Sequence, residues 1–282
     1  MTTHRKALGM NLHVDSEVGR LKQVILHRPD LELKRLTPTN KDEFLFDDVL
    51  WVKRAKQEHD AFAESLRDLD VDVHLLEQLL RETVAIPEAK RHILDRSLLE
   101  TVYGPMAIDA LYNMFAGLDD ETLVEHLIGG ITKRELLERV EEPPSVVLST
   151  LDLDDLLLAP LPNHMFTRDT SAWIYDGVSI NAMRKRARRR ETVHYEAIYR
   201  WHPMFADSEF NVWSEGSVNG MATTEGGDIL VLGRGAVLVG MSERTTPQGV
   251  ERLASKLFAG GTATRIVALQ MHRSGPSCTS TR

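Results

Sequence analysis

The sequence predicts a mixed α/β fold in which a ββα unit repeats and a helical subdomain is inserted. The repeat is indicated by Asp169 and Asp228, because each acid precedes an apolar hairpin with a glycine at its turn and then an amphipathic stretch. The insertion is indicated by a cluster of short helical patterns over residues 79–142. Repeated hairpins favour small units over one doubly wound sheet.

Length and composition limit the class of protein. The 282 residues suffice for one large domain, or for one domain with an insertion. A net charge of -8 argues against nucleic acid or an anionic membrane as the main partner, because both select basic surfaces. No run approaches the roughly 20 apolar residues that cross a bilayer, and the first residues lack the apolar segment of a secretory signal. The single cysteine, Cys278, excludes an internal disulfide, so we expect a cytoplasmic protein.

The first half contains a strand, a helix, a second strand and then the helical cluster. Residues 24–26 form an apolar run that stops at a His-Arg-Pro sequence, which predicts a buried strand. Residues 41–70 carry apolar side chains at helical spacing, and residues 71–76 predict a short strand. Residues 79–140 are helical in pattern, with breaks at Pro87, Gly104-Pro105, Gly117 and Gly129-Gly130. Two prolines at 143 and 144 mark the return to the main body.

The second half contains the two repeated units. After Asp169 come SAWIY, a turn at residues 176–177, VSINAM and a helical pattern over residues 188–201. After Asp228 come ILVL, a Gly-Arg-Gly turn at residues 233–235, AVLVGM and a helical pattern over residues 247–258. A strand over residues 265–269 would enter a further unit, and the pattern is lost just after it.

The acids of the repeat are candidate site residues. Because each stands at the start of a hairpin, repetition would bring them together near one axis. Converging carboxylates suit a planar cation such as guanidinium, which they bind through paired hydrogen bonds. Glu225 precedes Gly226 and Gly227, which allow either a close backbone approach or backbone angles that other residues avoid. Taken alone, each motif fits a turn with surface acids, and Asp169 could simply cap a helix or pair with Arg168.

A basic run has three interpretations. Six cations occupy the seven positions 184–190. The run could be a nucleic-acid or localisation patch, although the net charge argues against that. A solvated helix start is favoured over such a patch. Alternatively, one arginine turns inward to hold a substrate carboxylate, a task that suits Arg better than Lys.

The histidines and glycines favour neither metal nor nucleotide chemistry. His194 and His202 are eight residues apart, and no His, Cys or Asp cluster has the spacing of zinc ligands. We interpret both histidines as helix-surface or packing residues. No glycine-rich phosphate loop follows a strand, so nucleotide binding has no support.

Up to about Leu269, the sequence resembles bacterial arginine deiminases. The matching segments are SEVGRLKQVILHRP, LTPTNKDEFLFDDVLWV, PLPNHMFTRD, RARRRETVHYEAIYRWHPMF, EGGDILVLGRGAVLVGMSERTT and IVAL. The resemblance implies a five-bladed α/β propeller of ββαβ-type units (the pentein fold), incomplete here, with an inserted helical subdomain. The corresponding division is residues 1–78 for the first propeller unit or units, 79–142 for the insertion, 143–269 for further units and 270–282 for an aberrant tail.

The resemblance also implies an activity and a set of site residues. The family hydrolyses L-arginine to L-citrulline and ammonia through a covalent cysteine intermediate, without a metal or organic cofactor, and its members form homo-oligomers. Asp169 would bind the guanidinium and Glu225 would orient the catalytic histidine. The remaining matches would hold the amino-acid end or wall the pocket, with Asp228 close by: Asn163, Phe166, Arg188 and Arg244.

The last residues depart from the family. The family next needs an FMHLDTV motif, with the catalytic histidine and a second guanidinium-binding aspartate, and later a glycine-rich stretch ending in the nucleophilic cysteine. Cys278 is not assigned that role, because the family's cysteine belongs to the last blade and the intervening blades are missing here.

We interpret this departure as the result of a frameshift. Residues 275–282 and a stop can be written with permitted codons as GGC CCT TCA TGC ACC TCG ACA CGG TGA. Read from the third base, these codons spell PFMHLDTV. We therefore expect a frameshift between about residues 270 and 275. A resequenced gene without a family motif in the alternate frame would contradict it.

As given, the chain is expected to be inactive, because catalytic residues act as a unit. Unpaired blade surfaces also predict poor solubility. Two alternatives stay open. One is another guanidine-modifying hydrolase or amidinotransferase, which the helical insertion and the Arg188 and Arg244 matches disfavour. The other is a non-catalytic arginine-binding fragment, with RNA binding a more distant possibility.

Overall fold

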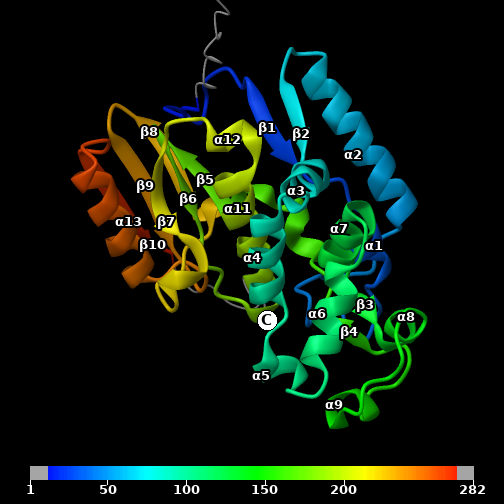
Figure 1. The fold of residues 1–282 in the computed structure, drawn as a ribbon. Coiled ribbons are helices and arrows are strands. Elements are labelled where there is room, and N and C mark those ends of the chain that lie inside the picture. The colour runs from blue at the N-terminus through cyan, green and yellow to red at the C-terminus, as the bar shows by residue number, and fades with distance from the viewer. Residues whose placement is uncertain (1–11, 272–282) are drawn as a thin grey trace, which may run out of the picture.

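A computed structural model describes residues 12–271 and shows a mixed α/β fold, as expected. The strands form four small sheets, ordered β1-β2, β3-β4, β5-β6-β7 and β10-β9-β8. In Figure 1 the two three-stranded sheets lie on one side of the molecule and most of the helices on the other. Within residues 12–271 no sheet closes on itself, so a five-bladed propeller is not seen.

The first half confirms two strands, although the first is half-buried and not buried as predicted, and corrects one helix. Strand β1 (Gln23–Leu26) pairs in parallel with β2 (Asp72–Leu75). Helix α1 (Leu31–Lys34) lies between them, followed by α2 (Val52–Arg67). The helical pattern that begins at residue 41 becomes a helix only at Val52. Before it, Phe44 is drawn into a small core with Leu33 and Leu36, and Leu45 adopts a positive φ of 63° that a helix does not permit.

The predicted helical cluster is confirmed, except that its first helix begins at Leu76 and that residues 131–132 form a strand. Its helices are α3 (Leu76–Val84), α4 (Pro87–Ser97), α5 (Glu100–Tyr103), α6 (Ile108–Ala116), α7 (Asp120–Gly129) and α8 (Lys133–Leu137). The breaks lie where the sequence placed them, since Pro87 begins α4 and Gly104, Gly117 and Gly130 end α5, α6 and α7. After α8 follows α9 (Val146–Ser149), and β3 (Ile131–Thr132) pairs with β4 (Leu156–Leu158). These helices share one hydrophobic core with later elements, so the domain limits stay a prediction.

The repeat is confirmed, and each unit has the ββαβ order that the family resemblance implied, one strand more than the ββα order of the residue pattern. The first unit contains β5 (Ser171–Ile174), β6 (Gly177–Ile180), α11 (Arg189–Trp201) and β7 (Asn211–Glu215). The second contains β8 (Ile229–Gly233), β9 (Ala236–Met241), α13 (Pro247–Ala259) and β10 (Arg265–Gln270). In both units the hairpin is antiparallel, and the third strand returns parallel to the second.

The expectation that the strand at residues 265–269 enters a further unit is therefore wrong. Strand β10 completes the second unit by pairing with β9. A parallel return needs a helical crossover, which α13 supplies.

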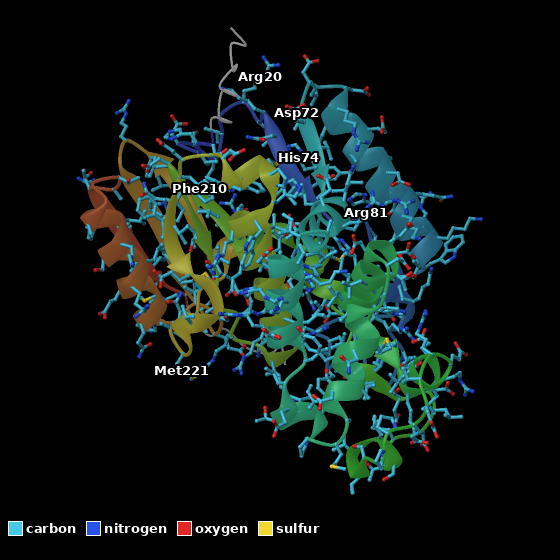
Figure 2. The ribbon with its side chains drawn as sticks, in the orientation of Figure 1. Arg20, Asp72, His74, Arg81, Phe210 and Met221 are labelled. Atoms are coloured by element: carbon cyan, nitrogen blue, oxygen red, sulfur yellow. The ribbon has the colours of Figure 1, made fainter. Side chains whose placement is uncertain are left out.

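Packing of the two units brings their acidic ends together. Helix α11 packs on the helical cluster and on β6, while α13 contributes to a second core between the two sheets that includes Ile174, Trp213 and Leu253. Phe210, labelled in Figure 2, closes the end of the first unit with its ring centroid 5.2 Å from that of Trp173. The short helices between these elements are η1 (Pro162–Met165), α10 (Thr167–Thr170), η2 (Arg186–Arg188), α12 (Pro203–Ala206), η3 (Gly216–Asn219) and η4 (Gly226–Asp228). Because the two units pack together, α10, which precedes β5, contacts η4, which precedes β8.

No helix within residues 12–271 has the length and apolar character needed to cross a membrane.

Candidate active site

The site begins where α10 meets η4. The Arg168 side chain fastens the two segments, donating from Nε to the Gly226 carbonyl oxygen over 3.1 Å and from Nη2 to the Ile229 carbonyl oxygen over 2.7 Å. Its carboxylate partner is Glu17, 2.8 Å away. The interpretation that Asp169 pairs with Arg168 is therefore wrong, and Asp169 is left to face the site.

The two glycines after Glu225 are required by the close approach of these segments. A Cβ on Gly226 would lie 1.9 Å from the Arg168 carbonyl oxygen, and one on Gly227 would lie 2.8 Å from Oδ1 of Asp169. Neither glycine has a positive φ. Of the two roles that the sequence left open, the structure selects close approach over unusual backbone angles.

Gly226→Ala is expected to destabilise the fold strongly. The new methyl group would meet a backbone oxygen fixed by the contacts of Arg168, so the two units must separate, at a cost of about 3 kcal/mol or more. Chemical denaturation measures the change. Gly19→Ala is the matched control, because its Cβ would meet only Ser16, at an ordinary 3.5 Å. Equal stability of the two variants would contradict the expectation.

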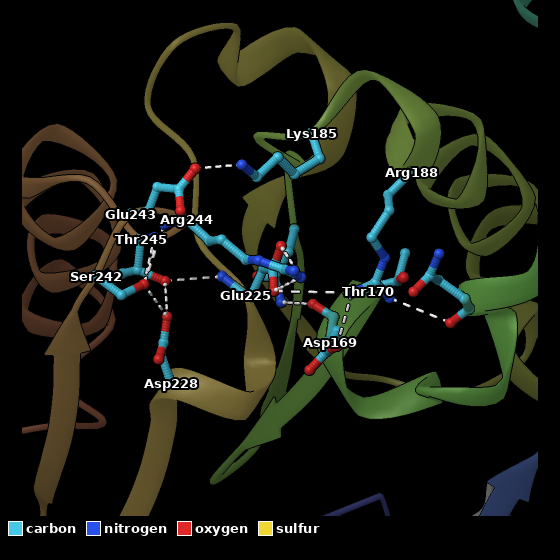
Figure 3. A network of polar contacts seen from close by, with 12 residues as sticks. Asp169, Thr170, Lys185, Arg188, Glu225, Asp228, Ser242, Glu243, Arg244 and Thr245 are labelled. Atoms are coloured by element: carbon cyan, nitrogen blue, oxygen red, sulfur yellow. Dashed lines mark hydrogen bonds and ion pairs between the residues drawn. The ribbon is translucent and has the colours of Figure 1, made fainter. Parts of the chain in front are cut away.

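A buried guanidinium lies at the centre of the site. Arg188, at the end of η2, is 0% exposed. Its Nη1 donates to Oδ2 of Asp169 over 2.7 Å and lies 3.7 Å from Oε2 of Glu225 (Figure 3). Its Nε and Nη2 donate to Glu191 over 2.9–3.2 Å, and Nη2 also reaches the Asn163 carbonyl oxygen at 3.2 Å. Three carboxylates thus surround one arginine side chain.

The second cation of the site is Arg244. Its Nη1 lies 3.1 Å from Oε2 of Glu225, the oxygen that Arg188 also faces. Asp228 does not join this group. Its Oδ2 instead accepts from the hydroxyls of Ser242, at 2.8 Å, and Thr245, at 2.5 Å. The predicted convergence therefore holds for Asp169 and Glu225, while Asp228 holds the turn that carries Arg244.

The ion pairs of the site join three carboxylates to two arginines. Asp169, Glu191 and Glu225 face Arg188 and Arg244, and the half-buried Arg190 also acts on Glu191 through its charge. Burial raises the pKa of Glu225 to about 7, against the opposing effect of the two arginines. Burial lowers the pKa of Arg188, but Glu191 and then Asp169 outweigh it, so Arg188 stays charged. Protonation of Glu225 therefore removes one negative charge from the free site at pH values below about 7.

The predicted pocket residues Asn163 and Phe166 both contact other parts of the chain. The Asn163 side chain is buried and donates from Nδ2 to the Phe44 carbonyl oxygen over 2.7 Å, so only its backbone oxygen reaches Arg188. Phe166 is 49% exposed, and its ring centroid lies 6.0 Å from Cζ of Arg188, as a wall of the site would. Contact of either residue with a substrate stays a prediction.

The basic run divides between surface and interior. Arg184, Arg186 and Arg189 are exposed, as the solvated helix start predicted, whereas Arg188 turns inward. The inward direction was one of the three interpretations, but the partners of Arg188 here are the chain's own carboxylates. His194 is a packing residue and not a surface residue, since it is 0% exposed and its Nδ1 lies 2.8 Å from Nε2 of His164.

Two residues of the site were missed. Glu191 is fully buried against Arg188, and Thr170 donates its hydroxyl to Oε2 of Glu191 over 3.0 Å. The i,i+3 spacing of Arg188 and Glu191 was the available signal, since such pairs share a helix face. In a run of exposed cations that spacing indicates only a surface pair.

Other elements of a catalytic site are not found in residues 12–271. In this range no three His, Cys, Asp or Glu side chains are grouped to hold a metal ion. Cys278 and the expected frameshift lie outside the described residues. No histidine of the described chain is hydrogen-bonded to Asp169 or Glu225; the partners of those carboxylates are arginines.

Comparison with known proteins assigns the family. The family model described as arginine deiminase matches residues 42–277, which is most of the chain. The chain belongs to the arginine deiminase family. The matched range of this arginine deiminase family member includes both ββαβ units and the site residues from Asn163 to Arg244.

Solved structures of dimethylarginine dimethylaminohydrolase are also similar to this arginine deiminase family member. One, an adduct with 4-chloro-2-hydroxymethylpyridine, has 15% identity and a TM-score of 0.46, with 90% of this chain and 62% of that chain covered. Another, from Pseudomonas aeruginosa and a mutant complexed with citrulline, has 14% identity and a TM-score of 0.46, with the same coverage. The chain spans less than two thirds of the length of these proteins.

Proposed function

We propose that Asp169 and Glu225 form the guanidinium-binding side of an arginine deiminase site, whose reaction converts L-arginine to L-citrulline and ammonia. One observation carries the proposal: Asp169 already binds a guanidinium, that of Arg188, with Glu225 3.7 Å from the same nitrogen. The convergence of these two carboxylates on one guanidinium nitrogen supports a cationic ligand. Membership of the family supports arginine as that ligand.

We further propose that the chain as given binds arginine without turning it over. The described residues offer acids and arginines at the site, but neither a thiol nor a histidine in contact with the acids. Without a nucleophile and a proton-transfer group, the loss of rate is not gradual. Isothermal titration calorimetry with L-arginine tests binding, and a colorimetric citrulline assay tests turnover. L-Lysine is the matched control ligand, because its ammonium cannot make the planar paired contacts of guanidinium. Absence of saturable arginine binding would refute the site, and citrulline production would refute the loss of turnover.

For the architecture, we propose that the two ββαβ units belong to a five-bladed propeller with an inserted helical subdomain at residues 79–142. Support comes from the identical strand order of the two units and from their side-by-side packing. A crystal structure of the frame-corrected protein with any other number of units would refute it.

Arginine binding is expected to strengthen as pH rises towards 7. The pKa of Glu225 is raised to about 7, mainly by burial, so its carboxyl is neutral in the free site at lower pH. A guanidinium ligand needs the charged form, so binding releases a proton, and affinity rises up to about tenfold per pH unit below 7 and levels off above it. Calorimetry between pH 5.5 and 8.5 measures this, and Glu225→Gln should flatten the profile. An unchanged profile in that variant would contradict the assignment to Glu225.

A further inference from the structure

Glu191 is a buried carboxylate that the proposed chemistry does not use. It is fully buried, comes from the first turn of α11, and faces the ligand-binding acids only through Arg188. Both of its oxygens accept from Arg188 Nε, at 3.1 and 3.2 Å, and Oε2 also accepts from Nη2 at 2.9 Å. A charged carboxylate is costly to bury unless a cation compensates it. Burial raises the pKa of Glu191, and the contacts with Arg188 and Thr170 oppose this shift.

The contacts of Arg188 are unequally divided. Glu191 takes Nε and Nη2, the Asn163 carbonyl oxygen takes Nη2, and only Nη1 faces Asp169 and Glu225. The same Nη1 would compete with a guanidinium ligand for Asp169. Displacing Nη1 leaves the other nitrogens bonded, so the side chain need not leave its place.

We propose that Glu191 is a positioning residue that anchors Arg188 beside the guanidinium position, so that ligand binding exchanges one contact only, that of Nη1 with Asp169. The proposal rests on the proposed function, because it takes Asp169 as the ligand's partner. Thr170 supports the anchor by donating its hydroxyl to Glu191 from the segment that also carries Asp169. Ligand-binding acid and anchor are thereby fixed to one another.

The first test needs no ligand. In the ¹⁵N-labelled chain the Arg188 Nε–H signal, assigned by its loss in Arg188→Met, should exchange slowly with solvent. Asp169→Asn should leave that exchange rate within twofold, and Glu191→Gln should raise it at least tenfold. Slow exchange that survives Glu191→Gln, or is lost in Asp169→Asn, would overturn the proposal. This arm gives its answer even if the chain binds no arginine, so it separates failure of the anchor from failure of the proposed function.

The second test adds L-arginine. With the anchor intact, the Nε–H signal should stay slowly exchanging at saturation. In Glu191→Gln only Asp169 and Glu225 remain to compensate the charge of Arg188. The Arg188 guanidinium then competes more strongly with L-arginine for Asp169, so the dissociation constant of L-arginine should rise at least tenfold. Arg189→Met is the matched control, since this neighbouring cation is exposed and should leave affinity unchanged. An unchanged dissociation constant in folded Glu191→Gln would overturn the proposal, because a purely structural role lowers only the melting temperature.

A milder variant covers the case in which Glu191→Gln does not fold. Thr170→Val removes the hydroxyl that supports Glu191 but keeps the buried charge pair. Faster Nε–H exchange and weaker arginine binding, each by about threefold, are expected. If Thr170→Val changes neither quantity, the anchor is not what holds Arg188.

Discussion

Asp169→Asn is expected to weaken arginine binding by about 100-fold. Asp169 is the one carboxylate of the site that makes a short bond of 2.7 Å to the guanidinium already present there. Neutralising it removes a charge-assisted hydrogen bond, and a loss of about 3 kcal/mol corresponds to that change in dissociation constant. Calorimetry at pH 8, where Glu225 is charged, measures it without interference from the titration of Glu225.

Two aspartates of the same chain make the test specific. Asp176→Asn is the matched control at the turn of the same hairpin, where the side chain accepts from Asn211 and Thr262, and it should leave affinity unchanged. Asp228→Asn should have a smaller effect than Asp169→Asn, because Asp228 bonds to Ser242 and Thr245 and acts on the site only through the turn that carries Arg244. Equal losses in Asp169→Asn and Asp228→Asn would mean that Asp228 contacts the ligand, as the family resemblance implied.

The elements that the sequence predicted well are those whose signal is local. A glycine at each hairpin turn, and apolar periodicity in α11 and α13, predict structure within a few residues, and both units formed as expected. The family resemblance implied a returning strand in each unit, but the residue pattern did not locate β7 or assign β10 to the second unit, because a parallel pairing depends on a partner many residues away. The helix expected from residue 41 failed for a similar reason, since Phe44 is buried by Leu33 and Leu36 from an earlier segment.

The site residues, too, were predicted where the signal is local and not where it depends on contacts between distant segments. Asp169 was predicted from its place before a repeated hairpin, and Asp169 and Glu225 both lie in motifs that match the family. Nothing local distinguishes Asp228 from them, although its hydroxyl partners turn it away. The family resemblance placed Arg188 in the pocket, but the residue pattern gave an inward arginine only as one of three interpretations. The direction of the side chain is decided by a buried carboxylate, Glu191, that the pattern did not reveal. Charge pairing inside a core is a property of the packed chain.

Arg188→Met is expected to lower the free energy of unfolding by about 3–5 kcal/mol. The change leaves Glu191 fully buried, with the Thr170 hydroxyl as its hydrogen-bond donor and without its paired cation. Removing one partner of a buried ion pair is strongly destabilising because the other charge stays buried and uncompensated. Urea denaturation at pH 7 measures the difference. Because the pKa of Glu191 is already raised by burial, the variant should recover part of its stability as pH falls and the carboxyl takes up a proton.

The second substitution Glu191→Leu decides whether that loss comes from the uncompensated charge or from lost packing. Arg188→Met together with Glu191→Leu replaces the buried pair by apolar side chains and should return stability to within about 1 kcal/mol of the parent, since apolar replacements of buried ion pairs are often neutral. Such a variant would be as stable as the parent but have no anchor beside Asp169. A double variant as unstable as Arg188→Met would show that the loss comes from packing, and would remove the reason for treating Glu191 and Arg188 as one electrostatic unit.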